Sequence, residues 1–353
     1  MSRPANGQDT GRVALVAIAA VATGAVLVSL REIIAPLVLA LFLAVVIDAV
    51  ARGLGRILPA IPARARLPLA FLLTAVLLGG ILYMAAANAG GFIAQLAQDR
   101  HRLNALFVRL AGRVGMAQPP HIHGLIGHFG VGRRLLQLAY GVQTLVFGAV
   151  LVLVYLIFLF ISRAGLRRKA KAMFRSDSQR ERAEAVVARI TGGIERYLRV
   201  QTLTALVVAG ASWILMAAVG LQNAPFWAFL IFLASYVPIL GGAVGLILPP
   251  IFALLQFDGL WQAVVLAVGA EAIHLIIGNV VAPRLQGASL NLDPLVVVLS
   301  LAFWGLLWGP IGMFLSTPLT VAAIVVLDQF DGVRWIAVLM SGDGRPGSHQ
   351  SAA

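Results

Sequence analysis

The chain of 353 residues contains no cysteine. Disulfide bonds, thiolate metal sites and a cysteine nucleophile are therefore excluded. Lysine occurs only at positions 169 and 171, and no Gly-x-x-x-x-Gly-Lys-[Ser/Thr] motif is present, which argues against ATP-driven transport by this chain alone. The motifs Gly-x-Ser-x-Gly and His-Glu-x-x-His are also missing, so we expect no enzyme activity and no cofactor.

Charged residues are scarce as well, at 12% of the chain, whereas a soluble domain has about a quarter. Hydrophobic residues make up 60%, and the mean hydropathy is +0.93. These values predict an all-α polytopic membrane protein. We expect about six full spans and two broken or re-entrant helical hairpins in the C-terminal half. The net charge of +13 indicates no nucleic-acid partner, because no basic segment is interleaved with aromatic residues.

Apolar and polar stretches alternate in an order that defines seven regions. Residues 163–200 hold 11 Lys and Arg against 4 acidic residues, so the positive-inside rule places them in the cytoplasm. The same argument places both termini on the cytoplasmic side of a bacterial inner membrane. This basic region either binds anionic lipid headgroups or only sets topology. The regions are a disordered tail (1–12), N-terminal transmembrane helices (13–87), an extracytoplasmic amphipathic helical region (88–142), one transmembrane helix (143–162), the basic cytoplasmic helical region (163–200), a membrane core with both broken segments (201–327) and a C-terminal tail (328–353).

Two apolar segments, 225–256 and 294–327, are interrupted by proline and glycine. Paired interruptions of this kind are the best sequence indication of a transporter binding site, because they free backbone groups to bind a solute. Close packing of glycine-rich helices is an alternative explanation. The two segments form either an inverted repeat or two ordinary kinked helical pairs. The interrupting residues that we place on a solute pathway are Pro238, Gly241, Gly242, Pro310 and Gly312.

Glu271 lies midway along an otherwise apolar span. A charged carboxylate there costs about 2.5–3.5 kcal/mol unless it takes up a proton. At 100° per residue, Glu271 and His274 share a small, polar face with Ala267 and Gly278, and we expect that face to point into protein. The pair is interpreted as a proton or cation coupling site, with a structural hydrogen bond between helices as the alternative.

Four further polar residues flank these elements. Asn279 and Arg284 belong to the connector after the span; Arg284 either holds an anionic or polyol solute or pairs with Asp293. Tyr236 either donates a hydrogen bond to a solute or marks an interface belt. The loop histidines His121, His123 and His128 are more consistent with an exposed loop than with a metal site.

The stretch from about Glu195 to Leu327 resembles the autoinducer-2 exporter family, or PerM-like permeases. The resemblance rests on Tyr236-Val-Pro-Ile-Leu-Gly-Gly242, Gly278-Asn-Val-Val-Ala-Pro-Arg-Leu-Gln-Gly287, Leu292-Asp-Pro-Leu-Val-Val297 and Gly309-Pro-Ile-Gly312. The chain departs from the family pattern at Asp48-Ala49, Val200-Gln201 and Asp293. The resemblance implies a multi-span exporter or permease that assembles as a homo-oligomer, with relatives assigned to autoinducer-2 export or cation/proton antiport.

These observations lead to a hypothesis of secondary-active export of a small polar molecule. Autoinducer-2 is the candidate solute, coupled to a proton or monovalent cation. Two alternatives remain open: a monovalent cation/proton antiporter, and an oligomeric membrane scaffold that transports nothing.

Overall fold

The structure, a computed structural model, describes residues 18–98, 148–281 and 291–345, apart from 19, 20, 164, 166, 167, 170, 171 and 175. Regular structure in these ranges is helical, and the only bridge between extended residues joins Leu292 to Ser341. Four of the described helices are long and apolar enough to cross a membrane. The predicted all-α polytopic fold is confirmed.

The N-terminal helices are longer than the predicted spans. The helix α2 covers Arg31–Ile57, and α3 covers Ala63–Gln98, beyond the expected membrane end at residue 87. Their excess length has a simple cause: Ala and polar residues favour helix as readily as apolar ones, so polarity ends a span without ending a helix. A further helix, Gly148–Arg163, covers most of the predicted fourth span and ends one residue beyond it.

The chain forms two compact units. Unit 1 comprises residues 1–44, 154–190 and 291–350, and unit 2 comprises 45–153, 191–290 and 351–353. The long helix α7 (Asp177–Val219) begins in the first unit and ends in the second. It joins the predicted basic region and the predicted fifth span into one element.

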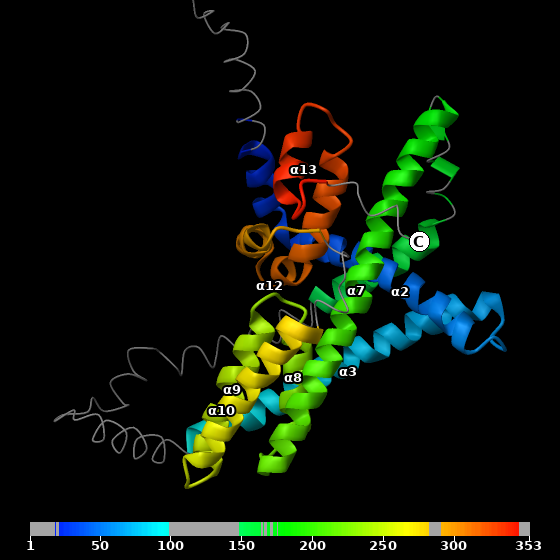
Figure 1. The fold of residues 1–353 in the computed structure, drawn as a ribbon. Helices are drawn as coiled ribbons and strands as arrows, with labels where there is room; N and C mark the ends of the chain where they lie inside the picture. Colours follow the sequence, from blue (N-terminus) through cyan, green and yellow to red (C-terminus); the bar gives the residue numbers. More distant parts are fainter. Residues whose placement is uncertain are drawn as a thin grey trace, which may run out of the picture. The chain divides into compact units, whose positions relative to one another are not determined.

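Unit 2 contains the first interrupted segment as a helical hairpin. It is built from α8 (Ala224–Ala234) and α9 (Leu240–Gln256), and α10 (Trp261–Ile276) runs back along α9 before ending in the π-helix η1 (Ile277–Val281). Figure 1 shows α8, α9 and α10 packed side by side along α7. The core between them includes Met216, Trp227, Ile231, Phe252 and Leu266.

The α8–α9 hairpin is too short on one side to cross a bilayer. The 11 residues of α8 rise about 16 Å, against a hydrocarbon core of about 30 Å. Its arms are antiparallel, because Trp227 stacks near Phe252 with ring centroids 5.2 Å apart, and Ile231 lies against Gly245. At its base, Gln256 Nε2 donates to the Gly220 carbonyl over 2.8 Å. The hairpin therefore enters and leaves at the same end of α7.

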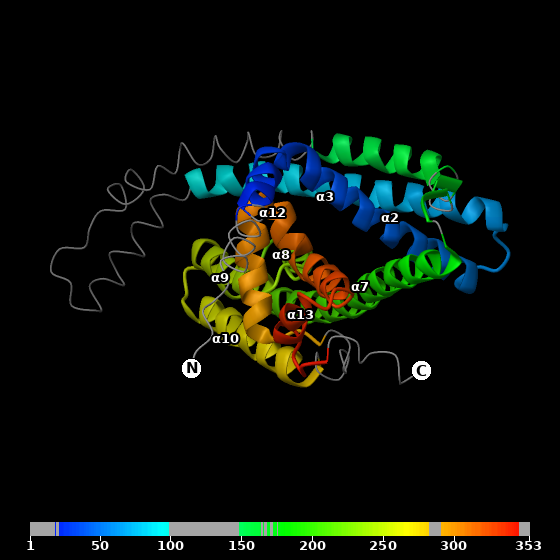
Figure 2. The same cartoon turned by 90° about the horizontal axis from the view of Figure 1, so that it is seen from above.

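Unit 1 contains the second interrupted segment, α12 (Pro294–Leu327), at the bounds that the sequence predicts. It folds sharply at Gly309, whose φ of 61° and ψ of −140° lie outside the helical region, and Figure 2 shows the two arms. Trp308 Nε1 donates to the Leu27 carbonyl over 3.3 Å, and Phe314 meets Phe42 edge-to-face at 5.9 Å. The hairpin thus packs against the N-terminal helices of its own unit.

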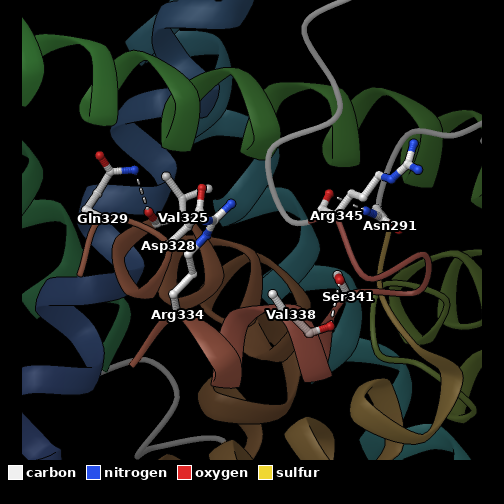
Figure 3. Close-up of polar contacts among 8 residues, drawn as sticks. All are labelled: Asn291, Val325, Asp328, Gln329, Arg334, Val338, Ser341 and Arg345. Atoms are coloured by element: carbon white, nitrogen blue, oxygen red, sulfur yellow. Dashed lines mark hydrogen bonds and ion pairs between the residues drawn. The ribbon is translucent and has the colours of Figure 1, made fainter. Parts of the chain in front are cut away.

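The C-terminal region, expected to be a polar tail, contains the short helix α13 (Arg334–Met340). After α13 the chain returns to the start of α12, where Gly342 N donates to the Asn291 carbonyl over 3.0 Å. Figure 3 shows Asn291 beside Arg345, and Asp328 paired with Arg334 at 3.2 Å. The segment after α13 therefore lies beside the start of the second hairpin.

Candidate functional site

The tip of the α8–α9 hairpin (residues 235–239) contains two of the ten predicted pathway residues. Tyr236 and Pro238 form the turn itself, and both are half-buried. Hydrogen bonds between residues three apart close the turn, including Leu240 N to the Val237 carbonyl at 3.2 Å. Pro238 suits this position because it has no N–H that a continued helix would use.

Gly241 and Gly245 allow the two arms of this hairpin to approach closely. A methyl group on Gly241 would lie 2.6 Å from the Ser235 Cα, and one on Gly245 would lie 3.5 Å from Ile231 Cδ1. The close-packing explanation therefore applies to Gly241 and Gly245. The backbone break that the sequence predicts occurs a few residues earlier, in the turn.

His274 of α10 faces the glycines of α9. A methyl group on Gly242 would lie 3.2 Å from His274 Cδ2, and one on Gly245 would lie 3.2 Å from His274 Cε1. The His274 Nδ1 atom lies 2.9 Å from the Ala270 carbonyl oxygen. A carbonyl only accepts, so Nδ1 carries the hydrogen in this contact.

Glu271 and His274 do not share one environment. His274 is half-buried against α9, whereas Glu271 and Gly278 are exposed. Residues three apart differ by about 60° around a helix, which places Glu271 beyond the edge of the α9 contact. No described residue hydrogen-bonds or ion-pairs with the Glu271 carboxylate. The predicted inward face is therefore split: His274 points into its unit, and the part of the chain that the structure describes leaves Glu271 uncovered.

The residues after His274 leave the α-helical pattern. Asn279 lies in η1, where its side-chain nitrogen donates to the Leu275 carbonyl over 2.9 Å. Single π turns occur often at functional sites, because they displace side chains around the helix. Arg284 lies outside the described residues. Asp293 caps α12 by accepting a hydrogen bond from Leu295 N over 2.8 Å.

Pro310 and Gly312 belong to unit 1 and so are separate from this group. Pro310 begins the second arm of α12, a position that suits its fixed φ. Gly312 touches the first arm, since a methyl group there would lie 1.9 Å from the Trp304 carbonyl oxygen. Among the described residues no group of three or more His, Asp or Glu is placed to hold a metal ion, and His121, His123 and His128 lie outside that part of the chain.

Sequence reasoning missed three residues of α7 that contact the tip. Tyr197 donates its hydroxyl hydrogen to the Tyr236 carbonyl over 3.3 Å, and Gln201 Nε2 donates to the Ser235 carbonyl. The Thr202 and Tyr236 hydroxyls lie 2.7 Å apart. The one available signal was the position of Gln201 and Thr202, two polar residues at the start of an apolar span.

Comparison with known proteins agrees with this architecture. Residues 15–332 match the family model described as AI-2E family transporter. The chain belongs to the AI-2E transporter family. It is similar to the AI-2 transport protein TqsA of Escherichia coli K12, with 29% identity over 88% of this chain and 90% of that protein. A putative transport protein of Haemophilus influenzae has 29% identity over the same shares, and the putative transport protein YhhT of E. coli K12 has 36% identity over 44% of each chain.

Membership of the AI-2E family establishes the broad class of this protein. It is a multi-pass membrane protein of a transport family, and its relatives in that family are described as transport proteins rather than enzymes. The AI-2E family match, residues 15–332, includes both interrupted segments and all ten predicted pathway residues.

Proposed function

We propose that this protein is a secondary-active exporter of a small polar molecule, driven by proton or monovalent cation flow across a bacterial inner membrane. The observation that carries the proposal is the position of His274 on α10, against Gly242 and Gly245 beside the hairpin tip. A titratable imidazole beside a broken helix places proton exchange next to free backbone groups.

Glu271 is the second residue, after His274, of the proposed proton or cation coupling site. Its carboxylate lies in an apolar helix and is not covered by the described residues. A charged carboxylate is costly in hydrocarbon and is not costly in contact with water. A change in its surroundings therefore couples proton uptake and release to movement of the pathway. Gln is the matched substitution, because it keeps the shape and cannot ionise.

The two hairpins provide the pathway in this proposal. Each has both ends at one side, and α10 with η1 forms a single crossing between them. One crossing between two such hairpins makes them enter from opposite faces. That arrangement is the inverted repeat of many secondary transporters. The N- and C-termini are then cytoplasmic.

Autoinducer-2 is the first solute to test, because TqsA is named for AI-2 transport. The experiment measures efflux of autoinducer-2 from loaded proteoliposomes under an imposed pH gradient, for the wild type, Glu271→Gln and Glu181→Gln. Glu181 is an exposed carboxylate on the polar part of α7 and serves as the matched control. We expect gradient-dependent efflux in the wild type and the control, and at least a tenfold loss in Glu271→Gln.

The same experiment separates the alternatives. Efflux in none of the three proteins rejects autoinducer-2 as the solute. Proton release that depends on Na⁺ or K⁺ without any solute, lost in Glu271→Gln, establishes the monovalent cation/proton antiporter instead. If no flux of any kind occurs and Glu271→Gln changes only thermal stability, the protein is a membrane scaffold.

Two partners complete the proposal. The family resemblance implies a homo-oligomer, which native mass spectrometry in detergent tests directly. The basic region 163–200 is proposed to bind anionic lipid headgroups. Co-purified phosphatidylglycerol or cardiolipin, lost when Arg167 and Arg168 are replaced by Gln, is the expected result.

A further inference from the structure

The tip of the α8–α9 hairpin contains a backbone conformation that its residue disfavours. Ile239 has φ of 72° and ψ of −37°. Positive φ is unfavourable for any residue with a Cβ, and most of all for a β-branched one. The corresponding fold of α12 uses Gly309, for which positive φ is unstrained. The first hairpin is therefore strained where the second is not.

Burial does not hold Ile239 in place. Its side chain is 64% exposed, and the next residue, Leu240, is 41% exposed. Strained residues persist only where the surrounding structure over-determines them, and they concentrate at switch regions. The restraint must therefore come from the backbone on either side of Ile239.

Hydrogen bonds from α7 supply that restraint. Tyr197 and Gln201 each donate to a carbonyl of the tip, those of Tyr236 and Ser235, and Thr202 bonds to the Tyr236 hydroxyl. The three α7 residues fall within two turns of one helix. They hold the end of α8 in a fixed position, four residues before the strained peptide.

The α7 segment is itself anchored beside these donors. Glu195, two residues before Tyr197, forms an ion pair with Arg52 of α2, and both lie in unit 2. Tyr236 is also fixed by Phe232, whose ring meets it edge-to-face at 5.5 Å. These contacts connect the strained tip to an anchored helix and thereby hold the tip in its strained conformation.

We infer that Tyr197, Gln201 and Thr202 are positioning residues that latch the tip of the first hairpin in a strained, closed conformation. When the hydrogen bonds break, Ile239 relaxes to negative φ and the start of α9 moves, which admits water beside Gly242 and His274. The consequence for transport rests on the proposed function. The existence of the latch does not, because it concerns the conformation of the tip alone.

The absence of cysteine makes a direct test available. Leu240→Cys places a single thiol at the tip, in reach of a membrane-impermeant maleimide only when water enters, because the thiolate is the reacting form. The labelling rate is measured in proteoliposomes for this reporter alone and combined with Thr202→Val, Gln201→Ala or Thr202→Ser. Valine keeps the shape of threonine without its hydroxyl, and serine keeps the hydroxyl.

Loss of one hydrogen bond shifts a two-state equilibrium by about fivefold. We therefore expect labelling about fivefold faster with Thr202→Val and with Gln201→Ala, and unchanged with Thr202→Ser. Adding Ile239→Gly relieves the strain, so it slows labelling. A role of Thr202 in packing alone predicts no change with Thr202→Val, which keeps the shape of threonine.

Three outcomes overturn or support the inference without ambiguity. Equal labelling rates in all folded variants overturn the latch, as does labelling that Ile239→Gly fails to slow. Size-exclusion elution and thermal unfolding identify any variant that fails to fold. In that case the labelling rates of Thr202→Val and Thr202→Ser, compared with each other, test the latch. Faster labelling in a protein that shows no flux of any solute or cation supports the latch and rejects the proposed function.

Discussion

The indole nitrogen of Trp304 donates a hydrogen bond to the hydroxyl of Thr320 over 3.2 Å. In a straight helix, these residues would be about 24 Å apart. The contact therefore requires that α12 fold back on itself between them, at Gly309. An apolar segment of 34 residues, long enough to cross a membrane once with a wide margin, is instead a hairpin.

The fold in α12 depends on the backbone of Gly309. Replacing it with alanine introduces no steric contact, since nothing lies within 4 Å of the added methyl group, but φ of 61° with ψ of −140° disfavours any side chain. We predict that Gly309→Ala lowers the free energy of unfolding by about 1–3 kcal/mol. Thermal unfolding in detergent measures the change. Gly210→Ala, equally free of contacts but helical within α7, is the control and is expected to be neutral or slightly stabilising.

The first hairpin offers a comparison of two adjacent glycines. A methyl group on Gly241 would lie 2.6 Å from a backbone atom, the Ser235 Cα, whereas one on Gly242 would lie 3.2 Å from the His274 side chain. A side chain moves aside more easily than backbone does. Gly241→Ala should therefore destabilise the protein by about 1–3 kcal/mol, the usual penalty of overpacking, and Gly242→Ala by less. Equal thermal stabilities of the two variants would contradict the described packing.

We predict that the Asn291 side chain holds the C-terminal segment 341–345 in its ordered conformation. The Asn291 side chain accepts from Asp343 N over 3.0 Å and donates to the Arg345 carbonyl over 3.1 Å, and its φ is 35°. Asn291→Ala removes these two hydrogen bonds and a third, from Asn291 Nδ2 to Asp343 Oδ1, at about 1 kcal/mol each. Hydrogen exchange of the peptide containing residues 341–345, followed by mass spectrometry, should become several-fold faster.

Gln329→Ala is the matched control for this change. The Gln329 side chain donates to the Val325 carbonyl of its own helix over 3.3 Å, as Figure 3 shows. Loss of that local bond should leave exchange at residues 341–345 unaltered. An equal response to both substitutions would mean that Asn291 does not anchor the segment.

Proline and glycine made both hairpins predictable from sequence, because these residues interrupt a helix by local physics. The bounds of α12 are those of the apolar stretch, and Pro238 lies in the observed turn. Helix ends within polar regions were less predictable: α7 continues from the basic region into the span without a break. Composition indicates where the chain leaves the membrane, whereas the ends of helices depend on capping and packing.

The contacts that shape the site were beyond sequence reasoning for a different reason. The Gln201–Ser235 and Thr202–Tyr236 bonds each join residues 34 apart, and Asn291 reaches Asp343 across 52. No local pattern marks such pairs. The separation of Glu271 from His274 has the same origin, since a 60° difference around α10 matters only once α9 is in place.

The proposed exporter requires two hairpins that enter the membrane from opposite faces, and single-cysteine labelling measures this directly. In the cysteine-free chain, thiols at Asn223 and Asp258 mark the ends of the first hairpin, and thiols at Gln329 and Asp331 mark the exit of the second. An impermeant maleimide added to intact cells should label only the first two, and all four should react after the membrane is opened. Labelling of all four positions, or of none, in intact cells would place both hairpins on one face and contradict the inverted arrangement.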